Sequence, residues 1–126
     1  MAGAEPVSIG ALDIQRITNI HHIVGIINQS ITLIQNTGDE DIAVALKEIT
    51  QTIVMTPHLE KHARQTTIEI LRTIAWEASL PPAERQLGIV KAALAYIPLL
   101  LNANPDIVNR FQPHLGQLRK FFDIPE

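Results

Sequence analysis

This chain has 126 residues, a formal charge of −3, 46% apolar residues and 18% charged residues, which is the composition of one globular domain rather than a disordered segment. Its ten Lys and Arg residues are scattered, which argues against a nucleic-acid surface, and the lack of cysteine excludes disulfides and thiol chemistry. We expect neither a signal peptide nor a membrane span, because no basic region precedes a long apolar run and the longest uncharged stretch is too polar. A cytoplasmic protein is therefore expected.

The stretch of residues 17–38 contains no charged side chain, and ten of the 18 residues from Ile17 to Ile34 are Ile, Val or Thr. Its large apolar residues do not share one parity, as a half-buried strand requires. Six of them follow instead the 3-4-3-4-3 spacing of the a and d positions of a helix, namely Ile17, Ile20, Val24, Ile27, Ile31 and Ile34. We therefore predict a helix over about 17–36 after a flexible tail at 1–11, with a strand-like segment or cross-β assembly as the alternatives. Gly38 lies just after this helix, where a residue in the left-handed conformation is expected.

These six residues, which we call the heptad seam, can be interpreted in two ways. β-branched residues and Gly25 weaken an isolated helix, so the helix has to pack against a partner. Its outer positions are uncharged polar residues such as His21, Asn28 and Gln29, which are easier to cover than Lys or Glu. The seam is then either an interface between copies of the chain, with Ile at a and d favouring trimers or tetramers, or the inner face of the first helix of a bundle.

Four further helices follow from breaker residues and apolar spacing. Over 39–55, Thr37 with Glu40 has the pattern of a capping box, and Ile42, Leu46, Ile49 and Ile53 fall on one face. For the helix over 57–79, Thr56-Pro57 reads as an N-cap followed by proline at the first helical position.

The segment 81–101 has apolar residues around most of its helical circumference, so it is expected at the centre of the fold. Asn104-Pro105 begins the last helix, and Pro98 and Pro113 are expected to bend the last two. The sequence thus predicts an all-α fold, a compact bundle of about five helices, in one domain over residues 1–126.

Few residues suggest chemistry. His58 and His62, four apart in a helix, have a spacing that can serve one metal ion, but no third ligand accompanies them. The chain shows no nucleophile motif and no phosphate-binding loop, so we expect no catalytic residues and no cofactor. Trp76 and Tyr96 are assigned to the core.

The run "INQSITLIQNTGDEDIAVALKEITQTI", residues 27–53, resembles small helical interaction domains of cyanobacterial and other bacterial multidomain signalling or effector proteins. The resemblance covers about a fifth of the chain and includes no catalytic motif. It implies an interaction or oligomerisation module and transfers no site residues.

These observations predict a non-catalytic module that binds itself, another protein, or both, with the heptad seam as its contact. Binding to nucleic acid or to a membrane is not expected. The alternative is a small-ligand or metal-binding helical sensor, or a small enzyme, with a pocket between helices.

Overall fold

The computed structural model describes the backbone of residues 4–124 and the side chains of residues 20–124. The described residues form α-helices joined by short connections and contain no strand, which confirms the predicted all-α bundle of five helices. The helices are α1 (Ala4–Asn36), α2 (Glu40–Val54), α3 (Lys61–Ser79), α4 (Leu87–Leu100) and α5 (Pro105–Phe121), with a short 3-10 turn, η1 (Pro82–Glu84), before α4.

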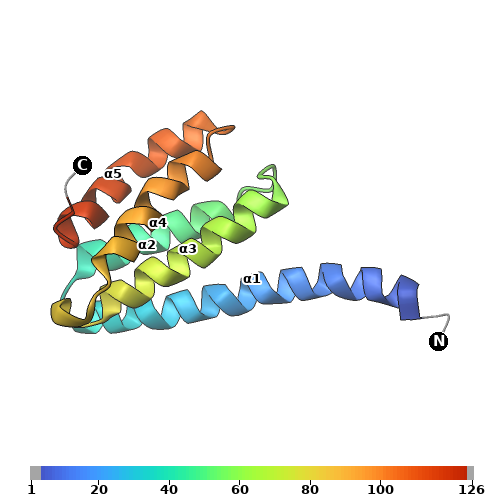
Figure 1. The fold of residues 1–126 in the computed structure, drawn as a ribbon, viewed down its shortest axis with the longest axis horizontal. Helices are drawn as coiled ribbons and strands as arrows, with labels where there is room; N and C mark the ends of the chain where they lie inside the picture. Colours follow the sequence, from blue (N-terminus) through green and yellow to red (C-terminus); the bar gives the residue numbers. More distant parts are fainter. Residues whose placement is uncertain (1–3, 125–126) are drawn as a thin grey trace.

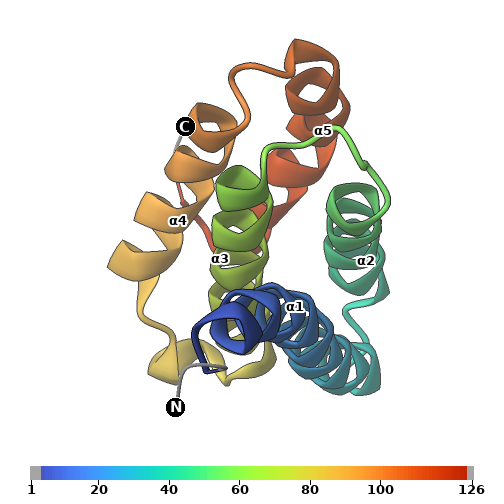
Figure 2. The same ribbon diagram turned by 90° about the vertical axis from the view of Figure 1, so that its right-hand side faces the viewer.

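Successive helices reverse direction along the bundle (Figure 1). α3 lies in the middle and packs against α1, α2 and α4, while α5 packs on α2 and over a smaller area on α4 (Figure 2). The prediction that the segment 81–101 is central is therefore wrong, because α3 occupies that place. α4 instead lies at one side of the bundle.

α1 is much longer than the other helices. Its 33 residues span about 50 Å, and its first turns extend beyond the other helices (Figure 1). Helical backbone from Ala4 onward includes residues 4–11, part of the stretch expected to be a flexible tail. Residues 1–3 of that stretch lie outside the described residues, and its mobility stays a prediction.

The core is built from one face of each helix. α2 buries all four residues of its predicted stripe, Ile42, Leu46, Ile49 and Ile53. α3 brings small residues as well as large ones to its contacts, among them Ala63, Thr67 and Ala75. Because small side chains let neighbouring backbones come close, this composition suits a helix that contacts three others.

The turn between α1 and α2 depends on Gly38, which has a φ of +90°. This left-handed conformation after a helix is the one predicted for it. The capping box is wrong, because Asp39 is the N-cap of α2 and makes no side-chain cap hydrogen bond. The Thr37 hydroxyl instead donates to the Ile34 carbonyl at 2.7 Å, in the last turn of α1. The same carbonyl accepts the backbone N–H groups of Thr37 and Asp39, so it is well satisfied at the end of the helix.

α3 begins later than the sequence predicts. Glu60, not Thr56, is its N-cap, and the Glu60 carboxylate accepts hydrogen bonds from the backbone N–H groups of His62 and Ala63, both at 2.9 Å. These two bonds favour the ionised carboxylate and hold the pKa of Glu60 below its usual range. Glu60 can cap two donors at once, whereas a Thr hydroxyl caps one, which explains the shift of the helix start.

Hydrogen bonds join the end of α3 to the residues just before α4. The Arg85 guanidinium donates to the carbonyls of Glu77, Ala78 and Leu80, at 3.0–3.2 Å. It also lies over the Phe121 ring, 4.6 Å from the centroid. The buried Glu77 carboxylate in turn accepts the backbone N–H of Gln86 just before α4. Arg85 therefore completes the end of α3, and Glu77 fixes the start of α4.

Candidate functional site

The heptad seam of α1 is largely part of the chain's own core. Ile27, Ile31 and Ile34 are buried, Val24 is partly buried against the core, and Ile20 has intermediate exposure. The side chain of Ile17 lies outside the described residues. Of the two uses of the seam considered above, burial favours packing inside the bundle over contact between copies.

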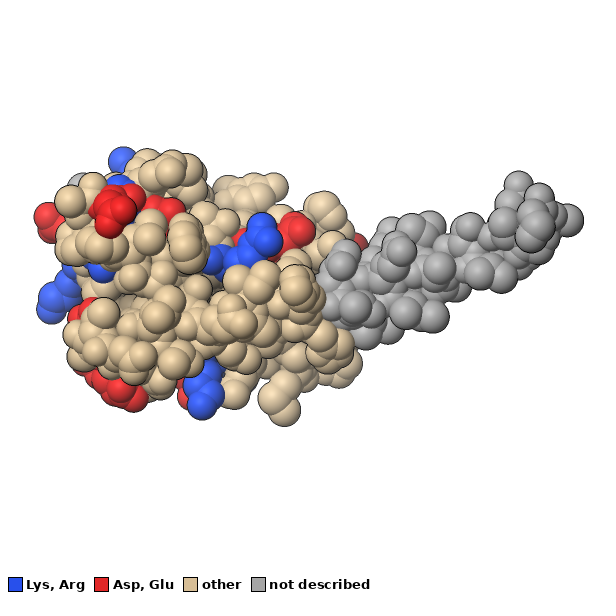
Figure 3. Space-filling model, turned by 90° about the horizontal axis from the view of Figure 1, so that it is seen from below, with Lys and Arg blue, Asp and Glu red and all other residues tan. Residues whose placement is uncertain are grey.

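The outer face of α1 carries no charge over the described residues. Figure 3 shows a band without Lys, Arg, Asp or Glu across this side of the molecule, with charged groups above and below it. The exposed side chains are polar and uncharged, except for Leu33, which is half exposed. One exposed leucine among amides and hydroxyls is ordinary for a surface helix.

The two histidines considered for metal binding do not share one helix. His58 lies in the turn before α3, and His62 lies in the first turn of α3. The spacing argument for a shared metal ion is therefore wrong, since it required both residues in one regular helix. Among the described residues no group of three His, Cys, Asp or Glu side chains could hold a metal ion.

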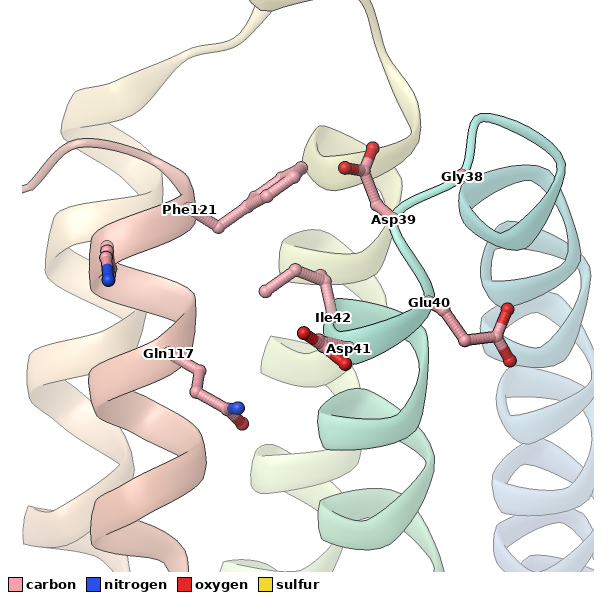
Figure 4. Close-up of a pocket in the computed structure, with 8 residues that line it drawn as sticks. Gly38, Asp39, Glu40, Asp41, Ile42, Gln117 and Phe121 are labelled. Carbon is pink, nitrogen blue, oxygen red and sulfur yellow. The ribbon is translucent and has the colours of Figure 1, made fainter.

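The acidic start of α2 borders a depression of about 420 Å³ between α2 and α5. Figure 4 shows its side chains diverging: Glu40 points toward α1, Asp41 points toward α5, and Asp39 points toward the Phe121 ring. Carboxylates that face three directions cannot bind one cation together. Their position at the start of α2 is explained by the helix dipole instead.

The surface of α4 is different. Of the eight large apolar side chains that are exposed among residues 20–124, four lie in this 14-residue helix, whose only charged residue is Lys91. Ile89 is 46% exposed, Tyr96 47% and Leu99 63%, and Ala92 between them is exposed as well. We call these four residues the α4 stripe. They follow one another at intervals of 3, 4 and 3 residues, so they lie along one side of the helix.

The stripe lies away from the side of α4 that faces the core. The buried residues of this helix are Val90, Ala93, Leu94 and Ile97, so α4 has apolar residues on two faces and covers only one of them with its own chain. The assignment of Tyr96 to the core is wrong for this reason, and so is that of Trp76 on α3, which is 52% exposed. Aromatic residues are enriched in protein interfaces, where such exposure is removed.

A signal for the stripe exists in the sequence. Val90, Leu94, Ile97 and Leu101 have heptad spacing, and the α4 stripe has the same spacing displaced around the helix. Two apolar seams on one helix indicate two neighbours. The pattern does not say which seam the chain itself covers, because that depends on contacts between segments far apart in the sequence.

Comparison with known proteins gives no match among protein-family models, curated protein sequences or solved structures. Within the described residues, no helix combines the length and the apolar character needed to cross a membrane. The fold and the surface therefore define the class: an all-α helical bundle with an exposed apolar face on α4.

Proposed function

We propose that this chain is a non-catalytic protein–protein interaction module that associates through the α4 stripe. The observation that carries the proposal is the exposure of Ile89, Tyr96 and Leu99 on one side of a helix with a single charge. Covering such a surface removes apolar area from water at little cost in desolvated charge. The proposed contact thus lies on α4, whereas the buried residues of the heptad seam, Ile27, Ile31 and Ile34, belong to the core.

Homo-oligomerisation is the form of association that we propose, in the cytoplasm. A chain without cysteine needs no oxidising compartment to fold, which supports this location. An adaptor role in bacterial signalling belongs to the same proposal and is supported by the resemblance of residues 27–53. These features have in common that the chain acts by bringing proteins together rather than by chemistry.

A matched pair of leucines tests the contact. Leu99 on α4 is 63% exposed and Leu33 on α1 is 50% exposed, so Leu99→Glu and Leu33→Glu make the same change on two different faces. The solution mass of wild type and both variants is measured by light scattering over a concentration series. Far-UV circular dichroism verifies that each variant keeps its helices.

The wild-type chain is expected to rise above the monomer mass of 14.0 kDa as its concentration increases. Leu99→Glu is expected to stay at the monomer mass, because pairing would bury an unpaired carboxylate. Leu33→Glu should associate like wild type. Loss of association in Leu33→Glu alone would place the contact on α1, and a monomeric wild type at all concentrations would refute homo-oligomerisation.

A further inference from the structure

The α4 stripe is complementary to itself when one copy is reversed. We propose that two copies of this chain pair through α4 in antiparallel orientation, related by a twofold axis that passes between Ala92 and Tyr96. This pairing rests on the proposed function and names its partner as a second copy. Three observations favour it: the order of large and small residues along the stripe, the small residues beside it, and the position of the one charge.

The order of residue sizes distinguishes the two orientations. In the antiparallel pair, Ala92 faces Tyr96 of the partner subunit, and Ile89 faces Leu99 of the partner subunit. Each contact then matches a small residue with a large one, or two aliphatic residues of similar size. In a parallel pair, Tyr96 would face Tyr96 of the partner subunit and Ala92 would face Ala92 of the partner subunit. The two tyrosines would be crowded, and the two alanines would leave a gap.

The flank of the stripe lets two helices come close together. Gly88 and Ala95 are exposed beside the stripe, next to Ala92 within it, and a Cβ added to Gly88 would meet nothing within 4 Å. Small residues at such positions allow short distances between helix axes. These small side chains therefore let a second helix approach α4 closely.

Charge and helix dipoles favour the same orientation. Lys91 is the only charged residue of α4, so a parallel pair would place two like charges at the same level. In the antiparallel pair the two Lys91 side chains are displaced from each other along the helix axis. The two helix dipoles then run in opposite directions, which is the favourable arrangement. The stripe contains no charged residue, so it needs no partner of opposite charge. An identical stripe on a second copy is therefore enough to cover it.

The area of the stripe sets the strength of the contact. A fully exposed aromatic side chain presents roughly 150–250 Å² and an aliphatic one somewhat less, so Ile89, Tyr96 and Leu99, each about half exposed, offer together with Ala92 on the order of 350 Å² per copy. Two copies would bury about 700 Å² of apolar surface, below the roughly 1,200 Å² of a stable interface. A reversible dimer that dissociates on dilution is therefore expected, not a permanent one.

Disulfide trapping tests the orientation, and the chain is suited to it because it has no cysteine of its own. The single variants Ile89→Cys and Leu99→Cys are oxidised mildly, each alone and as an equimolar mixture. In the antiparallel pair the two copies of residue 89 are about 15 Å apart along the axis, beyond the reach of a disulfide, while residue 89 lies opposite residue 99. Leu33→Cys on α1 measures the background of random collisions.

The proposal predicts that the mixture forms disulfide-linked dimers at least ten-fold faster than either single variant, and that the single variants stay near the Leu33→Cys background. Rapid linkage of each single variant with itself would overturn the antiparallel orientation and leave α4 as the contact. Linkage no faster than background in every sample would overturn pairing through α4. In that case the solution-mass series separates the two proposals. A monomeric wild type would refute homo-oligomerisation as well, whereas a wild-type assembly that only Leu33→Glu dissociates would have its contact on α1.

Discussion

Replacing Arg85 by alanine should weaken the whole fold, because one side chain ties α3, α4 and α5 together. The guanidinium donates three hydrogen bonds to backbone carbonyls at the end of α3 and lies 4.6 Å from the centroid of the Phe121 ring. A hydrogen bond from a charged donor contributes about 1.5–3 kcal/mol, and a cation–π contact about 0.5–1 kcal/mol at an exposed site. The bonds share one partly buried side chain and are not additive, so we expect Arg85→Ala to lower the free energy of unfolding by about 2–3 kcal/mol.

Arg85→Lys sharpens this prediction. Lysine keeps the charge but cannot reproduce the planar set of donors, so it should recover less than half of the loss. Urea unfolding followed by circular dichroism measures both variants at one fixed, low protein concentration, because association would add to the apparent stability. Arg110→Ala, at an exposed position of α5, is the control and should change stability by less than about 0.5 kcal/mol. An equally small effect of Arg85→Ala would refute the bracing role.

Further substitutions test the structure in other places. Gly38→Ala should lose about 1 kcal/mol in urea unfolding, because alanine is strained at a φ of +90°; Gly25→Ala, in an exposed and open position of α1, should instead gain up to about 1 kcal/mol. Ile27→Ala should cost about 2–5 kcal/mol, because this residue is fully buried, and Ile27→Glu should unfold the domain rather than only dissociate it; a folded Ile27→Glu monomer would return the heptad seam to the interface. Glu60 has a depressed native pKa, so its stabilising effect is full above the usual value of 4.5 and is lost as the pH falls through the native value. Glu60→Ala should therefore lower the melting temperature more near pH 6 than near pH 3, and an equal loss at both values would contradict the capping role.

Residue spacing alone predicts much of this fold. The stripe of α2 and the turn at Gly38 depend on neighbours within a few residues, and both are as predicted. The helix over 17–36 is also confirmed, although its β-branched residues have low helix propensity. Packing against the rest of the bundle compensates for that propensity, and the unbroken spacing of apolar residues is the part of the sequence that reports on packing.

The errors arise where two local signals compete or where distant contacts decide. Thr56-Pro57 and Glu60 both offer a helix start, and the carboxylate that accepts two backbone N–H groups prevails. The position of α4 depends on which of its two apolar seams meets α3, which no local pattern encodes. The sequence therefore places Tyr96 in the core, although its side chain is half exposed and forms part of the surface that we propose as the site.

The one-sided attachment of α4 has a consequence for the motions of the molecule. α4 packs mainly on α3, and Pro98 has no N–H to offer to the carbonyl one turn earlier, whereas α3 is enclosed by three helices. The amide protons of α4 are therefore expected to exchange with solvent through local opening, well before those of α3, which require global unfolding. A second copy seated on α4 would slow that exchange, so the least protected helix of the isolated chain would report directly on its assembly.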